Sequence, residues 1–504
     1  MRSLLLFLFL ALGSSLCSSA LGAPRPNILL VYTDDQGYGD ASCLNPDSKF
    51  KTPHQDRLAR EGMRFTDAHS SDTVCTPSRY GLLTGRYSWR TTLKRGVYGA
   101  EHPCLIAEGR TTLASYLRAN GYHTAMVGKW HLGMDFPGTI GNRDWKQPVR
   151  DMPLDKGFDY YWGIPASMNY GVLAWFEGRF ARVPPTQWTK KKPNQIAISD
   201  YRIKPPYETK QRADLMEVAP DFVDSDCLTR FTDQAIRWIE GKAEDARQGK
   251  PFFLYLPLTS PHKPVIPLGR FQGQGKAGAY GAFMIETDWH LGRLLALLDR
   301  ERLAENTIVI FTADNGPETT WRQRIEKHGH HSSGPYREGK RSIYEGGHRV
   351  PFFLRWPARV TPGSKWDAPI CQTDLLATFA AILERPLPEQ SGEDSISFHW
   401  AWSDPGFPRP RRLPVIHHAA NGRFAIRSEN WKLVMESPRK REKRELYDLK
   451  TDPGEQRDVL AGHPAVEKKL LSQLIEIVTS GSTRPDVESS NDTPAWEDLV
   501  WLPE

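Results

Sequence analysis

Four short, continuously apolar runs stand out along the chain, and polar residues follow each of them closely. Runs of this length without alternation are typical of parallel strands that are buried on both faces of a sheet. The runs cover residues 27–32, 124–127, 251–256 and 307–311. Segments with helical spacing lie around them at residues 112–120, 221–241, 291–298 and 374–383. This succession of strands and helices predicts an open α/β sheet.

The polar residues after these runs are candidates for chemistry. They are Asp34 and Asp35, then Lys129 and His131, then His262, and finally Asp314 and Asn315. Open α/β sheets place their sites at the carboxyl ends of the strands, so we expect these side chains to gather there. Adjacent carboxylates repel each other unless a cation or donors lie between them, and an exposed turn is the alternative. Lys129 and His131 would point to one side of an extended segment.

A further candidate is the stretch Cys75-Thr76-Pro77-Ser78-Arg79, which continues to Thr84-Gly85-Arg86. Pro77 suits the first turn of a helix, because its missing N–H would have no intrahelical partner there. Cys75 is therefore expected at a helix N-terminus, where unpaired N–H groups and the helix dipole favour negative charge. Arg79 lies one turn further along and adds a positive charge. Taken alone, this local context favours a buried thiol, which is where most free cysteines are found.

The whole stretch resembles the signature of the sulfatase family, in which Cys-x-Pro-Ser-Arg is followed by a short spacer and Thr-Gly-Arg. Further segments resemble the family in the same order: Gly128-Lys129-Trp130-His131-Leu132-Gly133, Ser260-Pro261-His262, and the segment from Gly339-Lys340 to Pro351. The resemblance extends from Asn27 to about Leu460. Within the alkaline phosphatase superfamily, the sequence is similar to the arylsulfatase A-like branch of the sulfatases.

The resemblance implies a large mixed, mostly parallel sheet flanked by helices, alkaline phosphatase-like, with a smaller C-terminal α+β subdomain. We expect a signal peptide at residues 1–23, a catalytic domain at 24–385 and the C-terminal subdomain at 386–504, where a proline-rich stretch changes the composition. A length of 504 residues allows two domains, and 39% hydrophobic with 25% charged residues excludes a mainly disordered chain.

The resemblance also implies the chemistry. In the family the signature cysteine is oxidised after translation to Cα-formylglycine, whose hydrate attacks sulfur, and Cys75 matches that position. By the same match Arg79 holds this group in place, and Lys129 and Lys340 neutralise the sulfate oxygens. His262 matches the histidine that protonates the leaving oxygen. His131 matches the one that takes a proton when sulfate is expelled.

A metal site is expected beside residue 75. The side chains of Asp34, Asp35, Asp314 and Asn315 offer oxygen ligands, which select a hard cation such as Ca²⁺ or Mg²⁺. The resemblance implies one Ca²⁺ per chain, with an oxygen of the modified Cys75 and the substrate sulfate completing its coordination.

The N-terminus has the pattern of a secretory signal: Arg2, an apolar run and small residues up to Ala23. No later run approaches about 20 apolar residues, so we expect export to a periplasmic, extracellular or lysosome-like compartment, without a stable membrane span. A formylglycine-generating or equivalent enzyme is an expected partner. Four cysteines remain besides Cys17 and Cys75, and their disulfide pairing is open.

The expected substrate is a sulfated saccharide or another sulfate ester, and no nucleic-acid partner is expected. A formal net charge of +6 is compatible with an anionic substrate. Lys190–Lys192 and a basic loop at residues 322–331 favour one, and the loop's histidines lack the spacing of zinc ligands. Residues 136–220 lack a clear period, so we expect long loops that shape the substrate entrance.

Two other functions compete with this interpretation. One is a phosphonate monoester or phosphodiester hydrolase of the same superfamily, because phosphate and sulfate have similar shapes. The other is an exported glycan-binding protein that retains the fold without turnover. Loss of Cys75 or of a metal ligand would mark the second, and none of these positions is lost.

Overall fold

The four apolar runs form neighbouring strands at the centre of a ten-stranded sheet in the computed structural model, which describes residues 25–190, 203–402, 413–437 and 442–502. They are β1 (Asn27–Asp34), β4 (His123–Lys129), β12 (Phe252–Pro261) and β13 (Thr307–Ala313). Their order is β13-β1-β12-β4 and every pairing among them is parallel, as the sequence predicts. The expected signal peptide at residues 1–23 lies outside the described residues.

Shorter strands complete this sheet at both edges. They are β2 (Met63–Phe65), β7 (Tyr160–Ile164), β8 (Phe176–Glu177), β9 (Phe180–Ala181), β14 (Phe352–Arg355) and β15 (Ser364–Trp366). The full order is β15-β2-β14-β13-β1-β12-β4-β7-β8-β9. Because β14 runs antiparallel to both of its neighbours, and β8 and β9 are also antiparallel, the sheet is mixed and mostly parallel. The expected fold class is confirmed.

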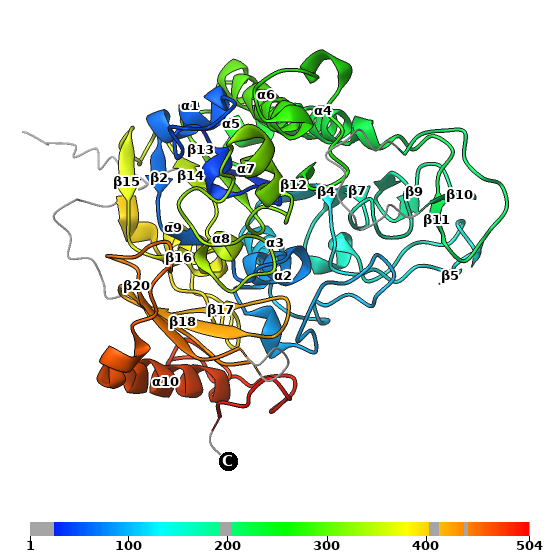
Figure 1. The fold of residues 1–504 in the computed structure, drawn as a ribbon. Helices are drawn as coiled ribbons and strands as arrows, with labels where there is room; N and C mark the ends of the chain where they lie inside the picture. Colours follow the sequence, from blue (N-terminus) through cyan, green and yellow to red (C-terminus); the bar gives the residue numbers. More distant parts are fainter. Residues whose placement is uncertain (1–24, 191–202, 403–412, 438–441, 503–504) are drawn as a thin grey trace, which may run out of the picture.

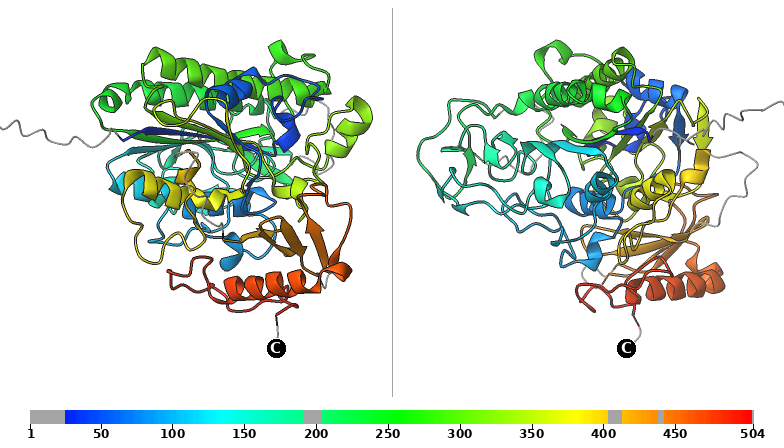
Figure 2. Two further views of the ribbon diagram at one scale, coloured as in Figure 1. Left: turned by 90° about the vertical axis from the view of Figure 1, so that its left-hand side faces the viewer. Right: turned by 180° about the vertical axis from the view of Figure 1, so that it is seen from behind.

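Helices cover both faces of the sheet (Figures 1 and 2). One face carries α1 (Pro53–Glu61), α4 (Cys227–Glu240), α5 (Ala243–Arg247) and α6 (Gly278–Arg300). The other carries α2 (Cys75–Thr84), α3 (Leu113–Ala119) and α9 (Leu375–Leu383). The helix predicted at 221–241 begins only at Cys227, because Asp224 is tied instead to Ile203, whose backbone N–H donates to its carboxylate at 2.6 Å.

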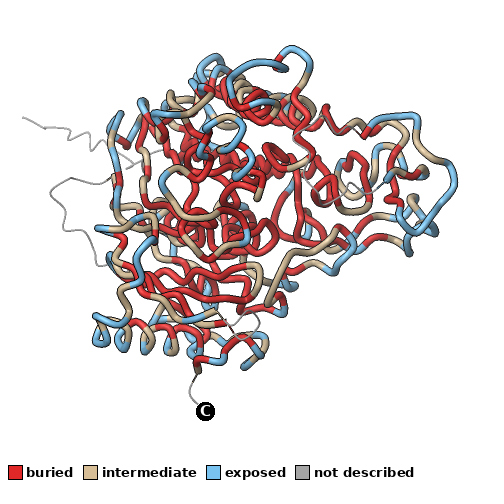
Figure 3. Tube along the Cα trace, in the orientation of Figure 1, coloured by how far each residue is buried: buried red, intermediate tan, exposed pale blue. Residues whose placement is uncertain are grey.

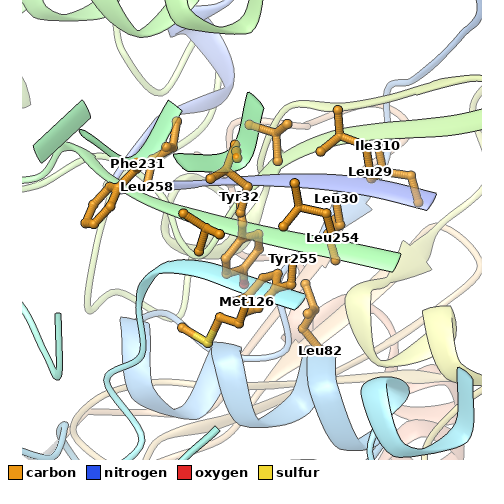
Figure 4. Close-up of a cluster of buried hydrophobic side chains, with 14 of the residues drawn as sticks. Leu29, Leu30, Tyr32, Leu82, Met126, Phe231, Leu254, Tyr255, Leu258 and Ile310 are labelled. Atoms are coloured by element: carbon orange, nitrogen blue, oxygen red, sulfur yellow. The ribbon is translucent and has the colours of Figure 1, made fainter. Parts of the chain in front are cut away.

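The main core lies between the sheet and these helices. Buried residues concentrate in the central strands, and exposed ones lie mainly on outer loops and outer helix faces (Figure 3). In the close-up of Figure 4, Met126, Tyr255 and Leu82 lie on the side of the sheet that faces α2. Phe231 and Leu258 lie on the side of α4. Burial on both faces explains why the strand sequences are continuously apolar rather than alternating.

A separate antiparallel sheet lies beyond the α2 layer (Figure 1). It consists of β17 (Val415–His418), β18 (Phe424–Ser428), β19 (Trp431–Val434) and β20 (Glu445–Asp448), with α10 (Pro464–Thr479) packed on it. The strands and helix expected in the C-terminal part are therefore present. The domain boundary at residues 385 and 386 stays a prediction.

The remaining elements are short. Three strand pairs are β3 (Ala68–His69) with β16 (Ile370–Cys371), β5 (Gly138–Thr139) with β6 (Asn142–Arg143), and β10 (Gln187–Lys190) with β11 (Leu215–Val218). The helices α7 (Trp321–His328) and α8 (Glu345–His348) follow β13. Residues 136–220 thus contain loops and short strands, as expected. Lys191 and Lys192 lie outside the described residues.

Candidate active site

Cys75 is the first residue of α2 and is buried at its N-terminus. Val74 precedes it in extended conformation, and Pro77 is the third helical residue, where it removes no intrahelical hydrogen bond. The helix ends at Gly85, which has φ of 64° and donates its N–H to the carbonyl of Gly81 at 2.9 Å. The predicted position of the cysteine at a helix N-terminus is confirmed.

The ends of β1 and β13 bring the predicted oxygen ligands together. Thr33 pairs with Ala313, so Asp34 and Asp35 lie beside Asp314 and Asn315, and all four polar residues are buried. Asp35 has φ of 67°, and its N–H donates to Asp314 Oδ1 at 3.1 Å. Asn315 Nδ2 donates to Asp35 Oδ1 at 2.8 Å. The exposed turn that the sequence left open as an alternative is therefore wrong.

Three buried cations surround these carboxylates. Lys129 Nζ donates to Asp34. Arg79 Nη2 donates to Asp314 Oδ2 at 2.9 Å, and its Nη1 donates to the carbonyl of Lys129 at 3.0 Å. Lys340 Nζ donates to Asp35 Oδ1 at 2.6 Å and lies 3.7 Å from the Sγ atom of Cys75. Three carboxylates and three cations therefore meet in one buried site around residue 75.

The two predicted histidines occupy different positions in this site. The Nε2 atom of His262 lies 3.7 Å from Asp35 Oδ2, and its Nδ1 lies 2.6 Å from the carbonyl of Lys263, which fixes a proton on Nδ1. His131 has φ of 63°, so the expected extended segment through Lys129 and His131 is wrong. Its Nε2 faces the carbonyl of Tyr98 at 2.9 Å, and its buried Nδ1 has no hydrogen-bond partner among the described residues.

Burial and charge shift the pKa values of this site. Burial disfavours the charged form of Asp34, but Lys129, His262 and Arg79 outweigh it and hold the pKa of Asp34 below its usual value. Burial and the charge of Asp34 raise the pKa of Asp314 to about 7. Burial also raises the pKa of the Cys75 thiol to about 11. The unmodified thiol is therefore protonated at neutral pH and is a poor nucleophile.

The oxygen atoms of this cluster fit a hard cation. Asp34 Oδ1, Asp35 Oδ2 and Asn315 Oδ1 are buried without a hydrogen-bond partner in the part of the chain that the structure describes. A buried polar atom without a partner is costly, and two of these atoms belong to carboxylates. Suitably placed ligand atoms of Asp34, Asp35, Cys75 and His262 also lie within 4.8 Å of one another. The chemistry of these atoms matches Ca²⁺ or Mg²⁺ rather than a thiolate-bound metal.

Cys75 opens onto a cavity of about 540 Å³. The lining includes residues that sequence reasoning did not single out, among them Asn169, Tyr170, Lys263, Glu318, Thr319 and Arg341. Lys263 and Arg341 directly follow the predicted site residues His262 and Lys340, and this adjacency is the sequence feature that indicates their place in the site. Tyr170 comes from the loop region of residues 136–220, and its ring lies 5.2 Å from that of His131.

The basic stretch at residues 321–331 does not line this cavity, as far as the structure describes the site. Residues Trp321–His328 form α7 rather than the expected loop. Its neighbour His330 is buried and lies 2.7 Å from Asp40. His330 thus contributes to packing, and none of the histidines in this stretch belongs to a potential metal cluster among the described residues.

A second buried cluster resembles a metal site in composition. It contains His69, Glu345, His348 and His417, whose potential ligand atoms lie within 4.8 Å of one another. The rings of His348 and His417 are stacked at 3.8 Å and 12°, so their lone pairs do not converge on one point. Lys432 Nζ already lies 3.0 Å from Glu345 Oε1 and 3.1 Å from His348 Nε2. An ammonium group therefore fills the position that an ion would take.

Other expectations concern cysteines and membranes. Cys43, Cys104, Cys227 and Cys371 carry thiols rather than disulfides among the described residues. Across the described ranges, we find no helix that combines the length and apolar character needed to span a membrane.

Comparison with known proteins identifies the family. The sulfatase family model matches residues 26–384, and the model of the N-sulphoglucosamine sulphohydrolase C-terminal region matches residues 336–480. N-acetylgalactosamine-6-O-sulfatase of Bacteroides thetaiotaomicron is 33% identical over 90% of this chain and 93% of its own length. Human arylsulfatase A is 31% identical over 93% of this chain and 89% of its own length.

A solved structure agrees with these relatives. It comes from work on the metabolism of multiple glycosaminoglycans by Bacteroides thetaiotaomicron and is 31% identical to this chain. It superposes with a TM-score of 0.78 over 90% of this chain and 99% of its own. The chain therefore belongs to the sulfatase family of sulfuric ester hydrolases.

Proposed function

We propose that this sulfatase hydrolyses sulfate esters of a carbohydrate, using a formylglycine made from Cys75 and one bound Ca²⁺. A relative named for N-acetylgalactosamine 6-sulfate and a structural relative from glycosaminoglycan metabolism support the carbohydrate. The signal pattern of residues 1–23 supports export to the periplasm, the medium or a lysosome-like compartment. A formylglycine-generating or equivalent enzyme is then a required partner for maturation.

One observation carries the proposal. The ends of four parallel strands deliver carboxylates, a lysine and histidines to a single buried site at the N-terminus of α2, around Cys75. The site opens to a cavity, so a substrate has access to it. The protonated state that burial imposes on the Cys75 thiol favours a modified residue over a thiolate nucleophile. The formylglycine supplies the nucleophilic oxygen once it has formed.

The metal would be held by Asp34, Asp35, Asp314 and Asn315. Three of these side chains have buried oxygen atoms without partners, which is the state expected of ligands waiting for a cation. Ca²⁺ supplies positive charge that polarises the sulfate group when bound. Since three cations already match three carboxylates, a divalent ion leaves the site positive and suited to an anionic ester.

Lysine and arginine side chains bind and orient the anion. Lys340 lies 3.7 Å from the Cys75 sulfur, and Lys129 reaches Asp34 from the end of β4. Both are buried, so their charges act on sulfate oxygens with little screening by water. Arg79 bonds both Asp314 and the carbonyl of Lys129, and so holds α2 in register with two strand ends.

The two histidines move protons. His262 lines the cavity and keeps its Nδ1 proton on the Lys263 carbonyl, so Nε2 must first take up a second proton, and the resulting imidazolium delivers that proton to the leaving oxygen. His131 donates Nε2–H to the Tyr98 carbonyl, which leaves the unpartnered Nδ1 as a proton acceptor. The carbonyls of Lys263 and Tyr98 therefore leave opposite ring nitrogens for proton transfer, Nε2 in His262 and Nδ1 in His131.

Release of inorganic sulfate from a panel of sulfated saccharides tests the proposal. The full chain is produced in a host that makes formylglycine, with Cys75→Ala as the inactive match. Release by the wild type alone is the expected result. Release from none of the saccharides, with formylglycine detected at residue 75 by peptide mass, would contradict it. Phosphate and phosphonate esters in the same panel identify the competing hydrolase activity.

A further inference from the structure

A charged cluster of three side chains lines the cavity beside the catalytic residues. Glu318 is buried and accepts hydrogen bonds from both terminal nitrogens of Arg341, the Nη2 bond being 2.9 Å long. Lys263 Nζ lies 3.8 Å from the same carboxylate. All three residues line the cavity onto which Cys75 opens. The catalytic roles proposed above use none of these three side chains.

Glu318 holds Arg341 in a fixed orientation. Thr319 donates both its backbone N–H and its hydroxyl to Glu318 Oε1, at 2.8 and 3.1 Å. The carboxylate is thus anchored by its own loop, and the paired contacts then fix the plane of the Arg341 guanidinium. Even so, 45% of the Arg341 side chain stays exposed. A guanidinium that is oriented in advance and still accessible is suited to binding a ligand.

The backbone of Arg341 gives independent support. Arg341 has φ of 76°, a left-handed conformation that costs energy for a residue other than glycine. Its N–H donates to the carbonyl of Thr73 at 3.0 Å, in the loop that leads into Cys75. The chain therefore retains a long charged side chain at a strained position next to Lys340. Such strain concentrates at functional sites.

The charges define what the cluster can bind. Two cations face one carboxylate, so the cluster keeps a positive charge at the entrance of an already cationic pocket. The Cα atoms of Lys340 and Arg341 are consecutive and lie about 3.8 Å apart. Lys340 reaches inward to Cys75, whereas Arg341 is bound to Glu318. A second anionic group would thus lie close to the scissile sulfate.

We propose that Arg341, assisted by Lys263, is a specificity residue that binds a second anionic group of the substrate. The group is a carboxylate or another sulfate, on the sugar that carries the scissile sulfate or on the sugar linked to it. This inference rests on the proposed carbohydrate sulfatase function. It deepens that function by making saccharides with at least two negative charges the preferred substrates.

Steady-state kinetics on matched substrates test this inference. The first is the singly sulfated monosaccharide that the wild type hydrolyses fastest in the panel. The second is the same sugar with another sulfate, and the third is its disaccharide with a uronic acid. The variant is Arg341→Asn, because asparagine tolerates positive φ. The control is Arg247→Asn on α5, since Arg247 is 40% exposed, pairs with Glu244 and lies outside the cavity.

The expected result is selective. Arg341→Asn lowers kcat/KM about 10- to 100-fold, mainly through KM, on the second or the third substrate, as expected for a lost charge-assisted hydrogen bond. On the first substrate the loss stays below about threefold, and Arg341→Lys recovers part of the selective loss. A selective loss on the second substrate identifies the second anionic group as a sulfate, and a selective loss on the third identifies it as a carboxylate.

Two results would overturn the inference. An equal loss on all three substrates would assign Arg341 a structural role, and no loss on any of them would remove it from recognition. Both differ from failure of the proposed function, in which the wild type releases sulfate from none of the saccharides in the panel.

Discussion

Two buried clusters of this protein both gather metal-binding residue types, and they differ in which atoms lack a hydrogen-bond partner among the described residues. The catalytic cluster around Cys75 has carboxylate and amide oxygens without partners and opens to a cavity. The histidine cluster, made of His69, Glu345, His348 and His417, has its ammonium group built in as Lys432. Lys432 also lies 2.8 Å from Glu455. The first cluster therefore fits the proposed cation, whereas in the second Lys432 fills the position that an ion would take.

Metal-binding residue types that lie close together do not by themselves establish a metal site. Ligand count and proximity are similar in the two cases, so they do not decide. The clusters are told apart by the atoms that have no hydrogen-bond partner among the described residues. In the catalytic cluster these atoms are oxygens. In the histidine cluster they are the ring nitrogens of His417, whose ring is stacked against that of His348. The histidine cluster joins α8 of the main body to β17 and β19 of the C-terminal sheet. We therefore expect the histidine cluster to stabilise the packing of the C-terminal sheet on the main body.

The largest expected effect is on turnover, from a change in the catalytic cluster. Asp35→Asn removes a carboxylate of the proposed metal site and the partner of Lys340, so kcat for sulfate release should fall about 1000-fold. His417→Phe in the other cluster should leave kcat within about twofold. Comparable losses in both variants would mean that the clusters are not functionally separate.

The next effect is on folding, from a change in the histidine cluster. Lys432→Met leaves Glu455 buried without its cation and removes one of the cations beside Glu345, which keeps Arg349, so the free energy of unfolding should fall by about 3–5 kcal/mol. Denaturant unfolding at neutral pH measures this. Lys365→Met is the matched control, because Lys365 is 49% exposed and should change stability by less than about 0.5 kcal/mol.

A smaller effect sharpens the assignment within the catalytic cluster. If His262 protonates the leaving oxygen, His262→Ala should lower kcat about 100-fold for sugar sulfates but less than about tenfold for activated aryl sulfates. The sugar alkoxide is the poorer leaving group and needs the proton more. Equal losses on both substrate types would remove the acid role from His262.

The smallest effect is the pH dependence of stability. Burial, together with His348, His69 and Lys432, holds the pKa of His417 well below 6.5, although Glu345 opposes this. Because the folded pKa lies below the unfolded one, this contribution is complete above about pH 6.5 and is lost as the pH falls.

Replacement of the ring tests this directly. Between pH 7 and pH 5.5 the free energy of unfolding of the wild type should fall by about 1 kcal/mol more than that of His417→Phe. Denaturant titrations at the two pH values measure the difference. Identical slopes for the two proteins would show that His417 does not titrate with unfolding.

The central sheet and the residues around Cys75 were predictable from sequence for a physical reason. Parallel strands buried on both faces have continuously apolar sequences, and polar residues at their carboxyl ends share one edge. Asp34, Lys129 and Asp314 therefore meet although they are far apart in the chain. The helix at Cys75 was predictable because Pro77 marks a first turn.

Other features were hidden because their signals are not local. The helix α7 has only one buried residue, Arg324, so it lacks an apolar face that periodicity detects. The positive φ of His131 depends on tertiary contacts, including its N–H bond to the Pro165 carbonyl. The pairing of Glu318 with Arg341 spans two loops, and the histidine cluster joins residues more than 300 positions apart.

The metal content of the purified full chain tests the difference between the two clusters most directly. Elemental analysis should find about one Ca²⁺ per chain in the wild type and in His417→Phe, and none in Asp35→Asn. That result would place the cation among the oxygen atoms around Cys75. A chain without calcium, or a transition metal that is lost with His417→Phe, would contradict the account.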